Sequence, residues 1–547
     1  MFIDSRRLPP NEVIETEVCI IGSGPAGISL AKEFIGKHFK VCLLESGDLA
    51  YDEETASLGE GEIEGDPFTT LRDMRYRQFG GNSNIWNVVL HQGRIGVRYV
   101  DLDPIDFEKR DWVPYSGWPM TKADLIPYYE RAHKFCQLGA YDYTANAWES
   151  EQAPILKLNE EKLVTSIFKF GPSNIYSGEY RKDIDESANI VTYTNANVVE
   201  IESEENSKII KRVHAACLTG NKFTVHAKIF IISAGGMENA RLLLLSNKVQ
   251  KTGLGNQNDV VGRYFMDHPL MHYLLLNLPD RKIFNKLALY DKRRVNNETV
   301  MGKFVLTESE VRKNRLLSCS ALLFPRDHRF KSESKKSIKE LVSKFKRGKV
   351  PSNAFGHIKN VALHVDEIVA DFYRYHIKKE EVRPNLAHGE WSLASGKENR
   401  YAKIEVMCLT EQAPHPDNRI TLSKNLDRLG CPQVKLTNRW NEIEIQSVNN
   451  SAKIMGAEFS KLGLGDLVPE YKDGKMDVRM STHHNIGTTR MNTDPKFGVV
   501  DADCKVHGIS NLYIAGSSVF PTGGYANPTL TIIALCMRLA DHVKTKM

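Results

Sequence analysis

The chain has 547 residues, of which 41% are hydrophobic and 26% charged, a balance that is typical of soluble globular proteins and excludes global disorder and fibrous repeats. Its 73 basic residues against 68 acidic ones give a net charge of +5, which is too small for general electrostatic binding to nucleic acid. At roughly 150 residues per domain, the length allows about three or four domain-sized units.

Targeting segments and cysteine motifs are also missing from the sequence. No apolar run approaches the ~18 residues that would span a bilayer, and the first 17 residues lack the apolar core of a signal peptide. The nine cysteines are scattered and form no CxxC pair, so a zinc ribbon, a redox dithiol and a c-type haem are unsupported. We therefore expect a reduced, cytoplasmic protein without a metal site.

The first predicted elements form a βαβ unit. The apolar run Val18–Ile21 indicates a buried parallel strand, an amphipathic helix then extends to about Gly36, and Val41–Leu44 indicates a second strand that ends at Glu45. This order of elements is typical of a nucleotide-binding α/β domain.

A GxGxxG motif occupies the first turn of this unit. Gly22 permits the tight turn, Gly24 lets the backbone approach a pyrophosphate, and Gly27 lets helix and strand pack closely. The helix N-terminus then offers free N–H groups to phosphate. Glu45 lies 18 residues beyond Gly27, near the spacing expected of an acid that accepts hydrogen bonds from ribose. The segment predicts a dinucleotide site, without separating FAD from NAD.

The last predicted elements are another strand and a helix. Leu512–Ala515 indicates a short buried strand, and apolar residues at helical spacing follow Asn527 and Pro528. Asn527 is a good N-cap and Pro528 a good first helical residue, so we expect the helix to start at Asn527 with its positive end open to an anion. In a flavoenzyme such a helix can stabilise the negative charge on the N1–C2=O edge of reduced flavin. A plain, well-capped C-terminal helix is the alternative.

Four segments together resemble the glucose–methanol–choline (GMC) family of FAD oxidoreductases. They are GSGPAG with Glu45, the loop GGNSNIWN at 80–87, SAGGMENARLLLLS at 233–246, and HHNIGT at 483–488. The last segment continues to Asn527-Pro528-Thr529 at the start of the predicted C-terminal helix. Order and spacing match over nearly the whole chain. The resemblance implies an α/β fold in which a Rossmann-like FAD-binding domain joins an α+β substrate domain built on an antiparallel sheet.

The resemblance also implies which residues bind FAD. Besides the three glycines and Glu45 of the first motif, they are Gly80, Gly81, Asn82, Ser83, Asn87, Val199, Ala234, Gly235, Gly516, Ser517 and Thr529. We expect the FAD to be non-covalent, because Ile85 stands where the family's pyranose 2-oxidase has the His that holds the flavin, and carbon cannot make that bond.

Three further stretches indicate a branch of the family. Residues 106–120, 260–269 and 411–423 resemble the group that includes pyranose 2-oxidase and bacterial sugar and aminoglycoside oxidoreductases. Asn527 agrees with this branch, because the glucose oxidase branch carries a second His at that position.

The implied reaction removes hydride from a CH–OH carbon, with flavin N5 as the acceptor. By the family's spacing before Gly-Thr, His484 is the base, and imidazole titrates near working pH. The amide of Asn527 would hydrogen-bond the substrate oxygen and orient it. We interpret His483 as a packed neighbour of the base and His268 as part of a structural turn.

The expected FAD-binding domain is discontinuous. It comprises 1–100, 186–275 and 475–547, and the substrate domain comprises 101–185 and 276–474. Within the latter, Tyr401–Thr410 shows the rough alternation of a strand that covers a cavity.

One basic stretch departs from the rest in composition. Residues 326–349 hold ten Lys or Arg and three Asp or Glu, a net charge of +7. Ile338, Leu341, Val342 and Phe345 have helical spacing, which predicts a basic amphipathic helix. A solvated helix packed on the substrate domain is the favoured interpretation; a lid, a membrane-surface helix and a partner site are the alternatives.

Three functions stay open at this stage. The first is FAD-dependent oxidation of a sugar, glycoside or aminoglycoside, with O2 or another oxidant as the electron acceptor. The second is the same chemistry on a non-sugar alcohol, such as a sterol or a natural-product intermediate. The third is a flavin-binding module without turnover, and the intact His484 and Asn527 pair argues against it.

Overall fold

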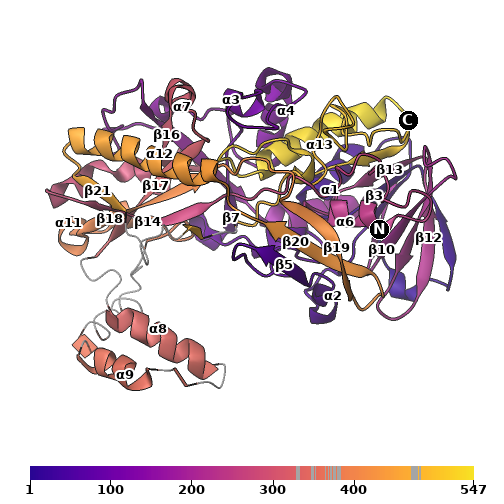
Figure 1. Ribbon diagram of the computed structural model, residues 1–547, viewed down its shortest axis with the longest axis horizontal. Helices are drawn as coiled ribbons and strands as arrows, with labels where there is room; N and C mark the ends of the chain where they lie inside the picture. The colour runs from indigo at the N-terminus through magenta and orange to yellow at the C-terminus, as the bar shows by residue number, and fades with distance from the viewer. Residues whose placement is uncertain are drawn as a thin grey trace.

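The structure is a computed structural model that describes two groups of sheets and the helices around them (Figure 1). The described residues are 1–327, 333–346, 350–351, 353–363, 365–366, 369, 373, 377, 384–469, 478–479 and 482–547.

A six-stranded parallel sheet has the order β1-β9-β4-β3-β13-β23, and each neighbouring pair is parallel. Its strands are β1 (Phe2–Asp4), β3 (Val18–Ile21), β4 (Val41–Leu44), β9 (Ile190–Thr194), β13 (Ile229–Ile232) and β23 (Leu512–Ile514). All residues of β3, β4 and β13 are buried, which explains why these strands are continuous apolar runs in the sequence. Three distant parts of the chain thus build one Rossmann-like sheet.

Several helices accompany this sheet. They are α1 (Pro25–Phe34), α4 (Lys122–Phe135), α5 (Tyr180–Asp185), α6 (Glu238–Leu245) and α13 (Thr529–Lys544). Helix α1, which begins directly after the glycine motif, packs against α13, and α13 packs against α4 (Figure 1). The first and last predicted helices are therefore neighbours in space.

A ten-stranded antiparallel sheet forms the other large part of the fold. Its main path is β21-β14-β18-β17-β16-β8-β7-β6, with β15 beside β16 and β22 beside β14. The strands are β6 (Val88–Val89), β7 (Ile95–Tyr99), β8 (Leu163–Pro172), β14 (Leu270–Asn277), β15 (Arg293–Val295), β16 (Glu298–Leu306), β17 (Cys319–Arg326), β18 (Lys403–Thr410), β21 (Asp466–Pro469) and β22 (Val478–Arg479). The strand predicted at Tyr401–Thr410 is confirmed as β18.

The sheets divide the chain differently from the expected domain ranges at two places. Strand β7 pairs with β8 and β6 pairs with β7, so both belong to the antiparallel sheet although 1–100 was expected in the FAD-binding domain. Strand β14 crosses the expected boundary at residue 275. The sheet to which a strand belongs is decided by its backbone pairing with distant strands, and neither composition nor turn signals indicate that pairing.

Two smaller sheets and the remaining helices complete the body. The smaller sheets have the orders β10-β11-β12-β2 and β19-β20-β5. Their strands are β2 (Glu12–Glu15), β5 (Gly61–Gly65), β10 (Asn197–Ser203), β11 (Ile210–Ala216), β12 (Lys222–His226), β19 (Arg419–Leu426) and β20 (Pro432–Asn438). The helices are α2 (Glu53–Ser57), α3 (Pro104–Phe107), α7 (Glu308–Asn314), α11 (Lys397–Arg400) and α12 (Glu442–Lys461).

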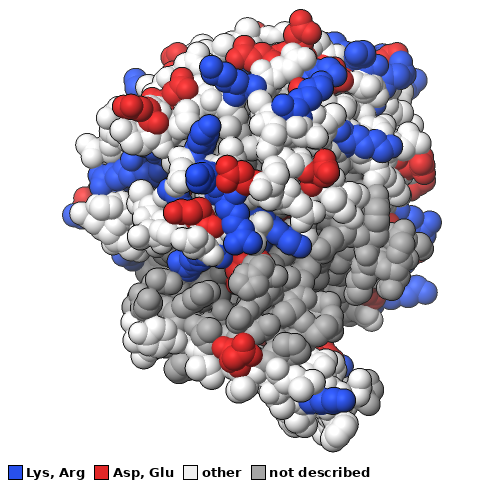
Figure 2. Space-filling view, turned by 90° about the vertical axis from the view of Figure 1, so that its left-hand side faces the viewer, with Lys and Arg blue, Asp and Glu red and all other residues white. Residues whose placement is uncertain are grey.

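The basic segment forms α8 (Glu333–Lys346), which pairs with α9 (Ala354–Leu363) in an arm that projects from the body (Figures 1 and 2). Ser337 of α8 is buried between the helices, where its hydroxyl contacts His357 at 3.1 Å. The predicted helix is thus present; within the described residues it packs on α9, whereas packing on the substrate domain was expected. Residues 328–332 and 347–349 of the segment lie outside the described residues.

Two properties of the described residues concern the expected cellular setting. None of the helices in the described ranges is long and apolar enough to cross a membrane. All nine cysteines are free thiols, and eight of them are buried. A cytoplasmic location stays a prediction.

Candidate active site

A cavity of about 870 Å³ brings together residues from all four sequence motifs. Its wall also includes Met407 of β18, Val97 and Arg98 of β7, and residues 385–388. The parallel sheet thus supplies one side of the cavity and the antiparallel sheet the other.

The turn after β3 presents bare backbone to this cavity. Gly22 has φ +102°, and a Cβ on it would lie 2.7 Å from the carbonyl oxygen of Ser233. A Cβ on Gly27 would lie 1.9 Å from the carbonyl oxygen of Gly22, so only glycine permits this approach of α1 to β3. Gly24 lines the cavity and has open space on its Cβ side. Bare backbone at a helix N-terminus fits the pyrophosphate of a dinucleotide.

Glu45 is fixed at the end of β4 beside this turn. One carboxylate oxygen accepts hydrogen bonds from the backbone N–H and the hydroxyl of Ser23, at 3.0 and 2.6 Å, and the other accepts from the N–H of Gly47 at 2.8 Å. The Ser46 hydroxyl also donates to this second oxygen, at 3.2 Å, so the about four acceptor positions of the carboxylate are occupied. Glu45 therefore shapes the turn and lines the cavity, and a ribose hydroxyl would have to replace one of the serine hydroxyls.

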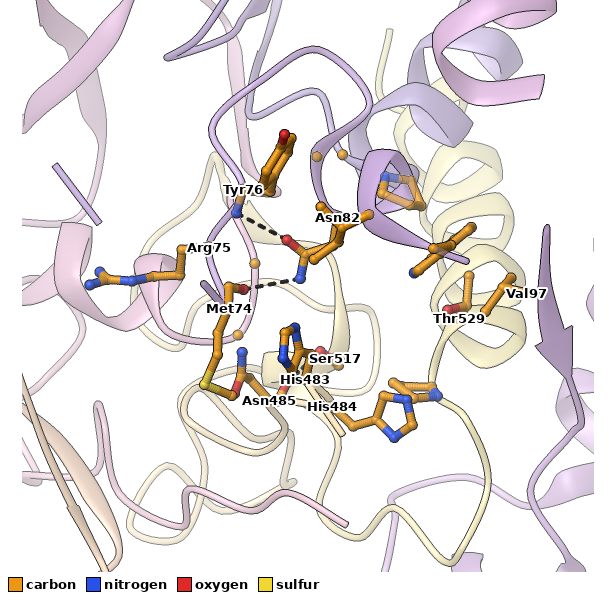
Figure 3. Close-up of a pocket in the computed structure, with 18 of the residues that line it drawn as sticks. Met74, Arg75, Tyr76, Asn82, Val97, His483, His484, Asn485, Ser517 and Thr529 are labelled. Carbon is orange, nitrogen blue, oxygen red and sulfur yellow. Dashed lines mark hydrogen bonds between the residues drawn. The ribbon is translucent and has the colours of Figure 1, made fainter. Parts of the chain in front are cut away.

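The loop after Gly80 folds onto the glycine motif. A Cβ on Gly81 would lie 3.0 Å from Cα of Gly24. The Asn82 side chain accepts from the N–H of Tyr76 and donates to the carbonyl of Met74, each at 3.0 Å (Figure 3). These contacts hold the loop over the place where the pyrophosphate is expected.

Most of the predicted FAD-binding residues line the cavity. They are Gly22, Gly24, Glu45, Gly81, Asn82, Asn87, Ala234, Gly235, Gly516, Ser517 and Thr529. Gly27, Gly80 and Ser83 instead shape the backbone, and Ser83 donates a hydrogen bond to the carbonyl of Gly80 at 2.7 Å. Val199 does not line the cavity, whereas Val198 does, because successive residues of a strand point to opposite faces. With these exceptions the donor set and the open backbone fit FAD.

The predicted base and its partner meet at the cavity wall. The amide Nδ2 of Asn527 lies 3.1 Å from Nε2 of His484, and Nδ1 of His484 lies 2.7 Å from Nδ1 of His268. Because an amide nitrogen can only donate, Nε2 is the acceptor and Nδ1 carries the hydrogen, which it donates to His268. His484 is therefore a neutral imidazole whose Nε2 lone pair faces Asn527.

Asp267 fixes the backbone of both histidines. Its buried carboxylate accepts hydrogen bonds from the N–H of His268 at 2.6 Å, the N–H of His484 at 3.2 Å and the hydroxyl of Thr482 at 2.7 Å. Burial raises the pKa of Asp267 to about 6. Interpreting His268 as a turn residue missed its contact with His484, for which the sequence offers no signal beyond the Asp-His-Pro triplet.

His483 is placed differently from its neighbour. It lines the cavity with φ +61°, and no hydrogen bond joins its ring to another described residue. In Figure 3, His483, His484, Asn485 and Ser517 form one group below the loop that carries Asn82. That His483 is not the base stays a prediction.

The electrostatic surroundings keep the histidine pair neutral. Burial lowers the pKa of His268 to about 4. Burial, followed by repulsion from neighbouring basic groups that include Arg98, lowers the pKa of His484 well below its ordinary value of 6.5. A neutral imidazole is the form that can accept a proton from a substrate hydroxyl.

We expect the rate of flavin reduction to be independent of pH between about 6.5 and 8. A base acts when it is deprotonated, so a lowered pKa moves the acidic limb of the rate profile below 6.5. Stopped-flow measurement of the reductive half-reaction with saturating substrate tests this expectation. A rate that rises tenfold per pH unit above 6.5 would contradict the neutral state.

The expected capping role of Asn527 is wrong. Helix α13 begins at Thr529, Pro528 holds the cap position, and no side chain caps the helix. The Asn527 amide instead turns toward His484, and its Oδ1 is buried without a hydrogen-bond partner. The side chain is therefore committed to the cavity and not to the helix end.

Comparison with known proteins gives the family. Residues 414–536 match the GMC oxidoreductase family. The chain is 26% identical to the fructose dehydrogenase large subunit of Gluconobacter japonicus, over 68% of this chain and 56% of that one. It is 23% identical to 2-methyl-1,2-propanediol dehydrogenase of Mycolicibacterium austroafricanum, over 97% and 96% of the two chains. It is 22% identical to 6'''-hydroxyparomomycin C oxidase of Streptomyces lividus, over 97% and 92%.

A solved structure supports the fold. Formate oxidase superposes with a TM-score of 0.53 at 16% identity, over 98% of this chain and 99% of that one. The two folds share a Rossmann-like parallel sheet and a large antiparallel sheet. The chain belongs to the GMC oxidoreductase family, whose members use FAD to oxidise CH–OH donors as oxidases or dehydrogenases.

Proposed function

We propose that the protein transfers hydride from a CH–OH group of a sugar, glycoside or aminoglycoside to FAD, with His484 as base and Asn527 orienting the substrate oxygen. The observation that carries the proposal is the contact between Nε2 of His484 and Nδ2 of Asn527, at 3.1 Å, in the wall of the cavity that fits FAD. Relatives named for fructose and hydroxyparomomycin support this substrate class.

The two side chains divide the work on the substrate hydroxyl. The substrate oxygen would enter between them, donating its hydrogen to Nε2 of His484 and accepting one from the amide of Asn527. As the carbon loses hydride, Nε2 takes the hydroxyl proton, so the product is a carbonyl compound. FAD, when bound, supplies the hydride acceptor, its N5 atom.

His268 would act through the base. Its Nδ1 accepts from Nδ1–H of His484 at 2.7 Å, which keeps the proton off Nε2 and fixes the ring plane. The hydrogen bonds from both backbone N–H groups to Asp267 prevent the pair from drifting apart.

A non-sugar alcohol is the second candidate substrate. It is favoured by the match along nearly the whole chain to a dehydrogenase named for 2-methyl-1,2-propanediol. Either O2 or another oxidant would reoxidise the flavin. Contact of the basic arm with a membrane surface is not favoured as part of this function.

Anaerobic reduction of the yellow protein tests the proposal. We expect bleaching of the flavin absorbance by at least one of glucose, fructose, a glycoside or paromomycin, and slower or no bleaching by 1,2-propanediol. Bleaching by the diol alone would replace the sugar with the second candidate. A flavin-loaded protein that no CH–OH compound reduces would defeat the proposed activity.

We expect acid precipitation to release all of the flavin as FAD. Ile85 lies in the cavity wall at the position where a histidyl bond would form, and its side chain offers no nucleophile. Chromatography of the supernatant should identify FAD and not FMN, because the turn after β3 is suited to a pyrophosphate. Yellow colour that stays in the precipitate would overturn the non-covalent assignment.

A further inference from the structure

Arg98 is a buried cation without a partner in the catalytic cavity. It lies on β7, is 4% exposed and lines the cavity. Its Nε and Nη1 atoms are buried without a hydrogen bond, and no carboxylate of the described chain pairs with it. Among the described residues, its guanidinium contacts the ring of Phe168, whose centroid is 5.0 Å away.

Most of the other buried arginines of the described chain are paired with carboxylates. Arg110 pairs with Glu411, Arg241 with Glu238 and Asp427, and Arg326 with Glu405. Arg490 has no carboxylate partner: it donates to the carbonyl of Tyr115, and its Nε and Nη1 atoms are buried without a hydrogen bond. Of Arg98 and Arg490, Arg98 is the one that lines the cavity where a ligand is expected.

The charge around Arg98 makes the absence of a partner more costly. Burial lowers its pKa to about 10, so the side chain is still charged at neutral pH. The titratable groups that feel its charge are His268, His484 and Lys303, which are all bases. A buried charge costs several kcal/mol unless it is paired, and a contact with an aromatic ring offsets only part of that cost.

We infer that Arg98 binds an anionic oxygen group of a ligand held in the cavity. A guanidinium presents donors in a planar fork that suits a carboxylate or phosphate. Neutral hydroxyl groups would satisfy its hydrogen bonds and leave its charge uncompensated. The anion has two possible sources, a carboxylate or phosphate group of the substrate, or the negative charge that the flavin ring gains on reduction. The second source rests on the proposed function.

The test compares Arg98→Gln with the wild type and with Arg94→Gln, a control that removes an exposed arginine near the same strand. The first measurement is calorimetric titration of the oxidised holoprotein with acetate, gluconate and inorganic phosphate. The second is the flavin reduction potential, determined by equilibration with a reference dye. Neither measurement requires turnover, so a protein that is inactive on every alcohol would defeat the proposed function and leave this test intact.

Each outcome decides the source or overturns the inference. If the anion is a group of the substrate, Arg98→Gln should weaken the binding of at least one probe tenfold or more and leave the flavin reduction potential unchanged. If the anion is instead the charge of the reduced flavin, the reduction potential should fall by about 30 mV and the affinity for the anions should stay unchanged. For a two-electron couple this shift is equivalent to a tenfold change in the equilibrium constant. If both quantities equal those of Arg94→Gln, Arg98 binds no anion. Should Arg98→Gln fail to load FAD, Arg98→Lys decides by the same two measurements, because it keeps the charge and loses the fork.

Discussion

Replacing His484 with alanine is expected to slow flavin reduction by about 10²–10⁴, the range that a positioned general base contributes. The flavin content should change little, because the cradle for FAD is built by the glycine turn and the loop after Gly80. The measurement is the rate of anaerobic flavin bleaching at saturating substrate, together with the flavin-to-protein ratio.

His483→Ala is the matched control for this variant. Both side chains line the cavity, but only His484 contacts Asn527 and His268. We expect a change of less than about tenfold for His483→Ala. If this control instead shows the larger loss with flavin retained, the base is His483 and the proposed register is off by one.

Asn527→Asp is expected to be folded, loaded with flavin and slow. The carboxylate has no N–H to offer the substrate oxygen, and its negative charge raises the pKa of His484 by favouring the imidazolium. The acidic limb of the rate profile should therefore move to higher pH than in the wild type. The same charge opposes reduction of a nearby flavin, so the reduction potential should also fall.

Stability separates this role from helix capping. Since the Asn527 side chain does not cap α13, the free energy of unfolding of Asn527→Ala should lie within about 0.5 kcal/mol of the wild-type value. Loss of a true N-cap lowers this free energy by about 0.5–2 kcal/mol. Urea unfolding at pH 7 measures the difference. Full activity of Asn527→Asp at an unchanged potential and pH profile would remove Asn527 from the active site.

The elements around the first glycine motif could be predicted because their cause is local. Val18–Ile21 and Val41–Leu44 are buried on both faces and are therefore apolar throughout. Gly22 and Gly27 are required by contacts within the same turn and with the adjacent strand. A pattern with a local cause can be recognised in the sequence, and so can the family's spacing between His484 and the Gly-Thr pair.

Other features depend on contacts between distant residues and were decided only by the tertiary structure. The Asn527 side chain could cap a helix or face a cavity, and the packing of α13 beside His484 selects the cavity. His268, which contacts the proposed base, lies 216 residues away from it in sequence. Strand β7 joins the antiparallel sheet by pairing with β8, and β6 joins it by pairing with β7.

The amino-acid sequence by itself determined the parallel strands, the glycine turn and the family, and it predicted the position of the proposed base, because each depends on residues close together or on a retained motif. The tertiary structure decided the tautomer of His484, the isolation of the arm formed by α8 and α9, and the unpaired charge of Arg98. A charge is unpaired only in relation to everything that surrounds it, and those surroundings are assembled from both ends and the middle of the chain.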